Sequence, residues 1–377
     1  MPANPNTLEH PIIDVDVHQR WRSPEEVVDH LPEKWRSYAT GRTGGKTTAL
    51  MPAGLTYPFH RGVNKRLEAV PEDGKGTSFP LMKEQYLDRY PSVEVVNLTF
   101  DIGQEVAQRN PEFSAALTTA MNDWVARTWL TYDPRMRTAI VVPTELPERA
   151  AAEIHRMAPN PKVTGVLIAW NPFGKPLGHP VYEPIWRAAE EEGLPIIIHG
   201  AAGETEGGLA QTTAGGLPGS RLEWHTLLQQ PTLAHLASFV VHGTFEKFPG
   251  LKVLVLETGL AWIPNFFWRL DAHHQEMRAE SDWVRRLPSE YLRDHVKFST
   301  QPFELTPRKE QLIEFFEAFG GMDQLLCFSS DYPHWDADDP FYVASRLPKE
   351  WLPNLFAENA RSMLRLLPVD SEQEVHA

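Results

Sequence analysis

Short apolar runs alternate with longer amphipathic segments along most of the chain. Eight runs predict strands, and several are rich in Val and Ile and apolar on both faces, as in a parallel sheet covered on both sides. These runs span 11–17, 94–99, 137–142, 163–169, 194–199, 237–242, 252–256 and 324–329. The segments between them are long enough to return the chain by helices.

Two of the connecting segments carry clear helical signals. In 111–130, Phe113, Leu117, Ala120 and Trp124 recur at helical spacing. Residues 181–192 follow Pro180 and stop at Gly193, directly before the next run. Eight strands alternating with helices predict an α/β protein, a (β/α)8 TIM barrel. The alternative, a doubly wound sheet, needs fewer strands and a glycine-rich dinucleotide turn that the sequence lacks.

We interpret the chain as one barrel domain, 1–377, with two additions. Residues 40–92 have weak periodicity and form an insertion after strand 1, and about 350–377 form a helical tail. Residues 200–220 contain seven glycines directly after the fifth run. A long loop at this place in a barrel is expected to be a lid or a substrate wall, or else a flexible connector.

Composition narrows the class of protein. Apolar residues make up 42% of the chain, enough for a large core, and the net charge is −14. This charge disfavours nucleic acid and anionic membrane surfaces as partners. The single Cys327 lies within an apolar run, so we expect a buried core residue and no disulfide. The chain shows neither a signal peptide nor a membrane-spanning run, which predicts a soluble, cytoplasmic protein.

Metal-capable side chains stand where four of the predicted strands end. Asp16 and His18 share one face of the first strand, because alternate residues of a strand point the same way. The fifth, sixth and eighth runs end at His199, His242 and Asp331. In a barrel these ends meet at one rim, where barrel enzymes build their sites.

Four of these residues predict one metal site. Asp16, His18, His199 and Asp331 offer two carboxylates and two imidazoles, with coordination positions left for water and substrate. A mixed N/O set without thiolate suits Zn, Mn, Fe or Co. The sequence has no G-x-S-x-G elbow, and its Gly41–Thr47 segment is one residue short of a phosphate loop.

Several short motifs carry a family resemblance that spans Ile12 to about Leu366. The chain resembles the amidohydrolase-related proteins of the group that includes aminocarboxymuconate-semialdehyde decarboxylase and the hydroxybenzoate-type decarboxylases. The motifs are His179–Trp186 (HPVYEPIW), Leu194–His199 (LPIIIH), Phe248–Val253 (FPGLKV), Ser330–Pro333 (SDYP) and Glu358–Arg361 (ENAR).

The resemblance implies a metal-dependent barrel of the hydrolase type. It matches Asp16, His18, His199 and Asp331 to the family's metal ligands, and His242 to its catalytic histidine on strand six. It implies a divalent cation (Zn, Mn or Fe), with His242 and Asp331 transferring protons. The reaction would be non-oxidative decarboxylation of an unsaturated or hydroxyaromatic acid, or hydrolysis of a C–N, C–O or C–C bond. A homodimer or an oligomer of homologous subunits is also implied.

Two departures from the family pattern leave alternatives open. Asp16 stands where zinc members carry the first histidine of His-x-His, and a carboxylate favours a harder ion such as Mn. This tilts the interpretation toward the decarboxylase. His334 follows Asp331 by three residues, so that with His242 and Glu257 there are more ligands than one ion needs.

A second metal at His242 and His334 would indicate a dinuclear iron or manganese monooxygenase on the same scaffold. A metal-binding pseudoenzyme subunit is the third hypothesis. In the simplest interpretation, His334 and Asp336 only hydrogen-bond the metal ligands or their loop.

The sequence defines the substrate-binding residues less closely than the metal ligands. Arg269 follows the run at 252–256 and is a candidate for pairing with a substrate carboxylate, or for an ion pair with Asp271 or a dimer contact. Arg61 and Arg66 in the insertion are weaker candidates. Trp335, with Trp262 and Phe266, is expected to line an apolar pocket for a small-molecule ring or polyene.

Overall fold

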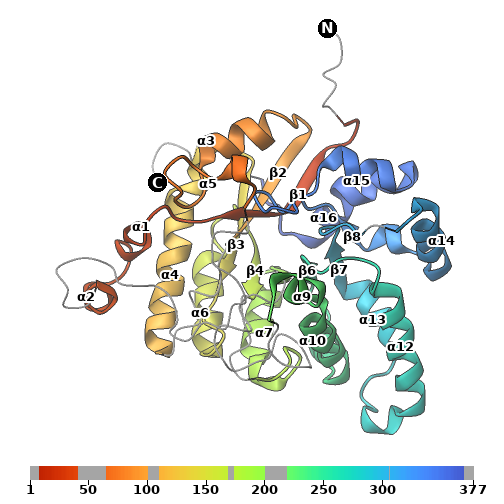
Figure 1. Cartoon of the computed structure of the whole chain (residues 1–377). Helices are drawn as coiled ribbons and strands as arrows, with labels where there is room; N and C mark the ends of the chain where they lie inside the picture. The colour runs from red at the N-terminus through yellow and green to blue at the C-terminus, as the bar shows by residue number, and fades with distance from the viewer. Residues whose placement is uncertain are drawn as a thin grey trace.

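The architecture was determined from a computed structural model, which describes residues 8–40, 65–100, 110–168, 174–199, 219–304 and 306–368. Its centre is a parallel eight-stranded sheet in the order β1 to β8 (Figure 1). The strands are β1 Ile12–Gln19, β2 Val93–Phe100, β3 Met136–Val141, β4 Val163–Ile168, β5 Ile196–His199, β6 Val253–Leu256, β7 Val296–Ser299 and β8 Leu326–Cys327.

The first and last strands come together and close the sheet into a barrel. The Val15 amide donates to the Phe328 carbonyl at 3.1 Å, and the His18 amide donates to the Tyr332 carbonyl at 2.7 Å. Val17 also forms a parallel bridge with Tyr332. The (β/α)8 barrel expected from the alternating pattern is confirmed.

Helices cover the outside of the barrel (Figure 1). The expected helices at 111–130 and 181–192 are confirmed as α4 (Pro111–Arg127) and α7 (Glu183–Glu191). The other α-helices are α1 Glu25–Val28, α2 Glu33–Thr40, α3 Phe79–Met82, α5 Trp129–Tyr132, α6 Pro147–Met157, α9 Arg221–Thr226, α10 Gln229–Val241, α11 Thr244–Lys247, α12 Ile263–Glu276, α13 Pro288–His295, α14 Lys309–Phe319, α15 Pro340–Arg346 and α16 Asn359–Met363.

Single turns of other helix types complete the structure. They are the 3-10 turns η1 Leu67–Ala69, η4 Pro180–Tyr182, η5 Arg278–Glu280, η6 Met322–Gln324 and η7 Lys349–Trp351, and the π turns η2 Lys83–Leu87 and η8 Asn354–Glu358. Within the part of the chain that the structure covers, no helix is long and apolar enough to cross a membrane.

One predicted strand is wrong. The run at 237–242 is the last turn of α10 and its cap, and the sixth strand is β6, which had been counted as the seventh. A short apolar run has the same composition in a buried helix and in a strand, so periodicity alone could not separate them. The seventh strand, β7, was missed because its four residues, Val-Lys-Phe-Ser, include two polar ones.

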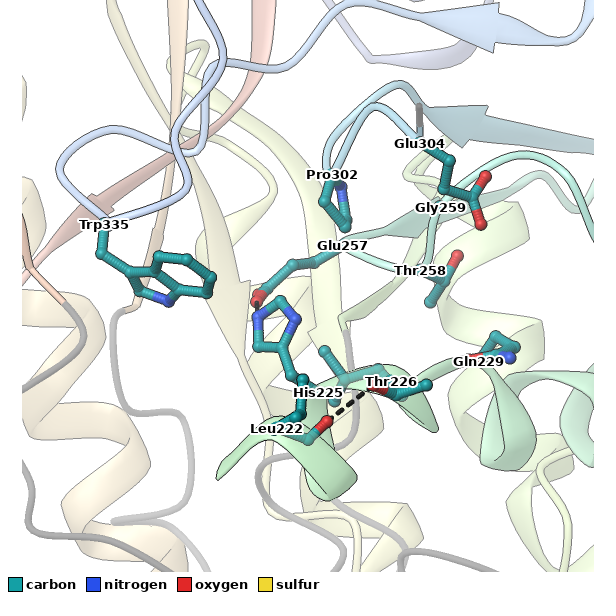
Figure 2. Close-up of a pocket in the computed structure, with 11 residues that line it drawn as sticks. Leu222, His225, Thr226, Gln229, Glu257, Thr258, Gly259, Pro302, Glu304 and Trp335 are labelled. Atoms are coloured by element: carbon teal, nitrogen blue, oxygen red, sulfur yellow. Dashed lines mark hydrogen bonds and ion pairs between the residues drawn. The ribbon is translucent and has the colours of Figure 1, made fainter. Parts of the chain in front are cut away.

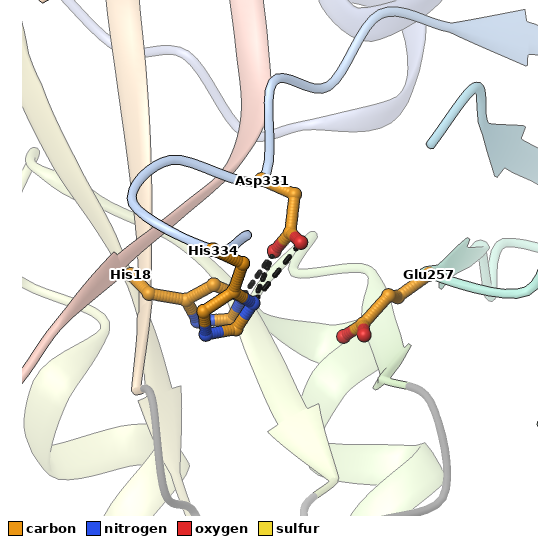
Figure 3. A group of neighbouring side chains, drawn as sticks. All are labelled: His18, Glu257, Asp331 and His334. Carbon is orange, nitrogen blue, oxygen red and sulfur yellow. Dashed lines mark hydrogen bonds and ion pairs between the residues drawn. The ribbon is translucent and has the colours of Figure 1, made fainter. Parts of the chain in front are cut away.

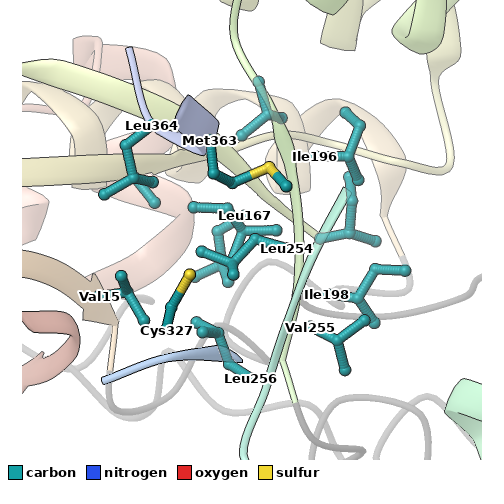
Figure 4. Close-up of a cluster of buried hydrophobic side chains, with 14 of the residues drawn as sticks. Val15, Leu167, Ile196, Ile198, Leu254, Val255, Leu256, Cys327, Met363 and Leu364 are labelled. Carbon is teal, nitrogen blue, oxygen red and sulfur yellow. The ribbon is translucent and has the colours of Figure 1, made fainter. Parts of the chain in front are cut away.

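The strands and the C-terminal segment share one buried apolar cluster (Figure 4). Cys327 is fully buried in it, and burial raises the pKa of its thiol to about 12, which confirms it as a core residue. Met363 and Leu364 belong to the same cluster. The next residue, Arg365, donates its amide to the Thr164 carbonyl near the start of β4. The segment after α16 therefore packs against the end of the barrel where strands begin.

The insertion after β1 contacts the loop that follows β8. The Arg66 amide donates to the Pro333 carbonyl at 3.0 Å, and its guanidinium donates to the Ala337 carbonyl. Arg66 thus holds the backbone on both sides of His334 and Trp335. Arg61 and the glycine-rich stretch at 200–218, where a lid or a substrate wall is expected, lie outside the described residues.

Candidate metal centre

Strand β1 carries three acidic or basic side chains, Asp14, Asp16 and His18, all fully buried, and its pairing with β2 is irregular between Asp14 and Val17. Asp14 is satisfied internally, because it accepts from the amides of Ser330 and Asp16 and from the Tyr86 hydroxyl. Burial raises the pKa of Asp14 to about 7. Asp14 therefore joins β1 to the loop after β8 and leaves Asp16 and His18 to face the site.

Thr99 on β2 determines how these two side chains are presented. It is the register partner of His18, and its hydroxyl donates to Asp16 Oδ1 at 2.5 Å. The same oxygen lies 3.1 Å from His18 Nδ1. A hydroxyl has one proton, so once that proton is given to Asp16, the oxygen must accept from His18 Nδ1–H. In a neutral imidazole this arrangement leaves the lone pair of His18 on Nε2, which faces Asp331 Oδ1 at 2.8 Å.

The inner group, defined as Asp16, His18, His199 and Asp331, brings its atoms together at ligand spacing. His18 Nε2 lies 2.8 Å from Asp331 Oδ1 and 3.3 Å from His199 Nε2. His199 Nε2 lies 3.3 Å from Asp16 Oδ2. Two ligands about 2.1 Å from one cation, at right angles, are about 3 Å apart. These contacts therefore match neighbouring positions around a single ion.

Two buried oxygens of the inner group, Asp16 Oδ2 and Asp331 Oδ1, make no well-aligned hydrogen bond among the described residues. Asp16 Oδ2 lies 3.3 Å from His199 Nε2, and Asp331 Oδ1 lies 2.8 Å from His18 Nε2 and 2.9 Å from His334 Nδ1. Without a cation these contacts require protons on the imidazoles, whereas a divalent cation accepts the lone pairs of the carboxylates and of neutral imidazoles together. The residues present therefore fit a metal ion.

The charged groups in and beside the inner group shift one another's pKa values. Burial by itself would lower the pKa of His199, but the Asp16 and Glu257 carboxylates raise it to about 9. Burial would likewise raise the pKa of Asp331, but His334 and His18 hold it well below its usual range. The group thus favours positive charge among its nitrogens and negative charge on its oxygens.

Two further residues adjoin the inner group, Glu257 and His334. Glu257 directly follows β6, and its Oε2 lies 3.2 Å from His199 Nε2. His334 Nδ1 lies 2.9 and 3.0 Å from the two oxygens of Asp331, and its ring stacks on His18 with centroids 4.2 Å apart. Figure 3 shows the Glu257 carboxylate pointing toward the stacked rings. Burial and the Asp331 charge raise the pKa of Glu257 well above its usual range.

A cavity of about 500 Å³ opens beside Glu257 (Figure 2). Its walls come from the chain after β6, β7 and β8 and from α9 with the start of α10, and consist of Leu222, His225, Thr226, Leu228, Gln229, Glu257, Thr258, Gly259, Pro302, Glu304 and Trp335. The Trp335 and His225 rings meet edge to face at 5.5 Å. His225 Nε2 lies 3.4 Å from Asp336 Oδ2 and 3.8 Å from Glu257 Oε1.

Comparison with known proteins identifies the family. The model of the amidohydrolase family matches residues 13–366. The chain belongs to this family. The amidohydrolase is 26% identical over 239 residues to a gamma-resorcylate decarboxylase of Polaromonas sp., with 58% of this chain and 66% of that one covered. It spans just under two thirds of that relative's length.

Solved structures share the fold. An amidohydrolase from Mycobacterium avium subsp. paratuberculosis is 20% identical, with a TM-score of 0.70 over 97% of this chain and all of that one. A 5-carboxyvanillate decarboxylase from Novosphingobium aromaticivorans, in complex with manganese and 4-hydroxy-3-methoxy-5-nitrobenzoic acid, is 20% identical. Its TM-score is 0.61, and the match covers 94% of this chain and 96% of that one.

The structure gathers six of the residues singled out from the sequence of this amidohydrolase: Asp16, His18, His199, Glu257, Asp331 and His334. Trp335 lines the cavity, and it is half exposed. Trp262 and Phe266 instead pack against the core. Arg269 is exposed on α12 and is not among the described cavity residues.

His242 lies elsewhere. It caps α10, and its ring meets that of His179 with centroids 5.7 Å apart. Its expected place at the rim depended on the strand that proved to be a helix. The residue that β6 carries to the site is Glu257, so a carboxylate stands where the resemblance implied a histidine.

Sequence reasoning missed Thr99 and His225. Thr99 gave no signal because its role depends on the register of β1 against β2. His225 lies on α9, in the connection between β5 and β6, and only its tertiary contact with Asp336 marks it. Glu257 did carry a signal, because it directly follows the apolar run 252–256.

Proposed function

We propose that this amidohydrolase is a divalent-metal-dependent decarboxylase, which releases the carboxylate of a small hydroxyaromatic acid as CO2. The observation that carries the proposal is the inner group of two carboxylates and two imidazoles beside an aromatic-lined cavity. Glu257 connects the two, since it contacts His199 and lines the cavity. The family and the activity of the gamma-resorcylate and 5-carboxyvanillate decarboxylases support it.

Asp16, His18, His199 and Asp331 would hold the cation. Manganese is the ion we propose, because carboxylate ligands suit a hard cation and a decarboxylase of the same fold contains manganese. When bound, such an ion supplies a Lewis acid that attracts the anionic oxygens of the substrate.

The walls of the cavity suit an aromatic ring. Trp335 and Leu222 offer apolar surface, and the Trp335 indole can stack on a ring. The described lining contains two carboxylates, Glu257 and Glu304, and no Lys or Arg. No cationic side chain among these residues can bind the carboxylate of an acid substrate. We therefore expect that carboxylate to point toward the metal-binding end of the cavity.

His225 is the proton donor we propose, with Asp336 holding its ring. His225 lines the cavity, and its Nε2 lies 3.4 Å from Asp336 Oδ2. When the bond between the ring carbon and the carboxylate breaks, the electron pair stays on the ring carbon, which takes one proton from His225. One aromatic acid anion and one proton thus give one arene and one CO2. This assignment replaces His242 in the proton-transfer pair, because His242 contacts His179 instead.

The test is a turnover assay with a panel of hydroxybenzoic acids, including gamma-resorcylate and 5-carboxyvanillate, on manganese-loaded protein in D2O. We expect one CO2 per acid consumed, one deuterium on the product ring, and no oxygen uptake. Absence of CO2 from every member of the panel would contradict the proposal. Net uptake of water into the product would indicate hydrolysis.

A second candidate function is a dinuclear iron or manganese monooxygenase. It is favoured by the extra ligands Glu257 and His334, which lie within reach of the inner group. Oxygen consumption coupled to substrate loss would select it. A pseudoenzyme subunit would bind metal and show neither reaction.

We also propose that the chain forms a homodimer or an oligomer of homologous subunits, which rests on the resemblance. We propose a cytoplasmic location as well, which rests on the single buried thiol. Light scattering of the purified chain tests the first, and fractionation of the source cells tests the second.

A further inference from the structure

The cavity carries a second carboxylate, that of Glu304, which the proposed chemistry does not use. Glu304 lies on the chain after β7 and is one of two acidic residues in the described lining, the other being Glu257. Figure 2 shows the Glu304 carboxylate on the side of Gly259 and Thr258, whereas the Glu257 carboxylate turns toward His225. The two acids therefore occupy different parts of one cavity, and Glu257 is the one that adjoins the inner group.

Backbone amides hold the Glu304 carboxylate in place. Its Oε2 accepts from the amides of Leu260 at 2.6 Å and Ala261 at 2.5 Å, in the loop after β6. Gly259 stands directly before them with φ at 72°, and a Cβ at this position would lie 2.8 Å from Glu304 Oε1. A side chain there would push the carboxylate away, so the glycine makes this close approach possible.

These bonds use only one oxygen of Glu304. Its Oε1 accepts no hydrogen bond from the residues that the structure describes, although a carboxylate oxygen has two lone pairs. The side chain is already ordered by the two amides. Little conformational entropy is therefore lost when a ligand donates a hydrogen bond to Oε1.

The surroundings of Glu304 suit an ammonium group. Across the described part of the chain, no Lys or Arg forms an ion pair with Glu304, so its charge is not neutralised by the protein. Thr258 and Gln229 line the same side of the cavity (Figure 2). An ammonium has three donors, and the Thr258 hydroxyl and the Gln229 amide carbonyl are acceptors for those that Glu304 leaves free.

The cavity also has the volume for a substituted ring. Its volume of about 500 Å³ is in the range of pockets that bury drug-sized ligands, about 300–1,000 Å³. A one-ring acid whose carboxylate points toward the metal-binding end leaves the part beside Glu304 unfilled. A substituent on the opposite side of the ring extends into that part.

We propose that Glu304 is a specificity-determining residue, which binds an ammonium group on the side of the substrate ring opposite the carboxylate. The inference rests on the proposed function for the orientation of the ring and adds a binding site for a second substrate group. An aromatic acid with an aminoalkyl substituent is then preferred, because its cation pairs with Glu304. A second carboxylate at the same place is disfavoured, because it meets a like charge.

The test compares three ligands that differ in one group: 4-(aminomethyl)-2-hydroxybenzoate, 4-ethyl-2-hydroxybenzoate and 4-(carboxymethyl)-2-hydroxybenzoate. Isothermal titration calorimetry on the full-length, manganese-loaded protein gives their dissociation constants, and a ligand that is turned over is compared by kcat/KM instead. We expect the aminomethyl acid to bind about 10-fold more tightly than the ethyl acid, as for a hydrogen bond between charged groups. The carboxymethyl acid should bind more weakly than the ethyl acid.

Glu304→Gln separates the charge from the structural contact. The glutamine carbonyl still accepts from the Leu260 and Ala261 amides, so the loop after β6 keeps its bonds while the negative charge is lost. The preference for the aminomethyl acid should then fall to within about twofold. Thr226→Val is the matched control, because Thr226 also lines the cavity but its hydroxyl donates to the Leu222 carbonyl within α9 at 2.6 Å. It should keep the full preference.

Equal wild-type affinity for the aminomethyl and ethyl acids would overturn the proposal, and so would no binding of the aminomethyl acid or an undiminished preference in Glu304→Gln. Circular dichroism monitors the fold, and the ratio of affinities is compared because a disturbed loop would weaken both ligands. The preference is measured without CO2 release. A preference without CO2 from any acid would refute the decarboxylation alone, and CO2 release without the preference would refute the Glu304 site alone.

Discussion

Replacing Thr99 by valine should weaken metal binding although Thr99 is not itself a proposed ligand. The side chain is fully buried, and valine has nearly its shape, so no cavity forms. The change removes the hydroxyl that donates to Asp16 Oδ1 at 2.5 Å and lies 3.1 Å from His18 Nδ1. Asp16 loses its donor, and His18 is no longer held in the tautomer whose Nε2 lone pair faces the cation.

The size of the effect follows from these two contacts. Partners that orient metal ligands typically contribute 10- to 100-fold to affinity, which corresponds to about 1.4–2.7 kcal/mol. Because Thr99 orients one carboxylate and one imidazole at once, we expect the upper part of this range. The metal-free variant should also be less stable by about 1–3 kcal/mol, because a buried carboxylate oxygen is left without a donor.

The assay is a competition titration of manganese against a chelator of known affinity, with urea unfolding of the metal-free proteins alongside. Thr99→Ser keeps the hydroxyl and should bind within a few fold of the wild type. Thr138→Val is the matched control, since Thr138 is equally buried in the barrel and its hydroxyl donates to the Leu98 carbonyl at 3.3 Å. It should lose stability while keeping its manganese affinity.

Manganese affinity of Thr99→Val within twofold of the wild type would refute the reasoning. It would show that His18 is presented correctly without the hydroxyl, and that the threonine serves packing alone. An equal loss of affinity in Thr138→Val would also contradict it, because the effect would then follow general destabilisation of the barrel.

Four other changes test the same centre. Manganese affinity should rise with pH up to about 9 and then level off. The carboxylates beside His199 raise the pKa of its imidazole to about 9, so below that pH a proton competes with the cation for His199. Isothermal titration between pH 6 and 10 measures this dependence. His225→Gln should lower kcat by about 10²–10⁴-fold with manganese affinity unchanged, as expected for loss of a proton donor, and steady-state kinetics with parallel metal titration checks it. His242→Ala should leave kcat within twofold, since the ring contacts His179, and a large loss would return His242 to the mechanism. Trp335→Ala should raise KM by about 2- to 10-fold, which corresponds to a stacking contribution of about 0.5–1.5 kcal/mol. An unchanged KM in initial-rate assays would exclude a stacking role for Trp335.

Much of the fold could be predicted because it depends on local patterns. Seven of the eight apolar runs are strands. The helix predicted at 111–130 from its spacing is Pro111–Arg127, and the helix predicted at 181–192 from its start and stop signals is Glu183–Glu191. Two elements were predicted wrongly. The run 237–242 belongs to a buried helix with the composition of a strand, and the strand Val296–Ser299 was missed because two of its four residues are polar. The count of eight strands was therefore right, although one of the predicted runs is a helix.

That error had a consequence for the chemistry. The run 237–242 predicts strand six and so places His242 at the rim, whereas β6 carries Glu257 there. Arg269 is exposed on α12 and is not among the described residues that line the cavity, so its pairing with a substrate carboxylate stays a prediction, as do the ion pair with Asp271 and the dimer contact.

The sequence by itself determined the barrel and the position of four candidate metal ligands at its rim. Asp16, His18, His199 and Asp331 each stand at or just beyond the end of an apolar strand, and parallel strands in a barrel must bring those ends to one rim. Tertiary structure alone decided what surrounds them. The Thr99 hydroxyl reaches His18 through strand register, His225 lies beside Asp336, and the His334 ring stacks on His18 at the edge of the inner group. Those contacts join residues far apart in the chain through side-chain direction, which a local pattern of apolar and polar positions does not encode.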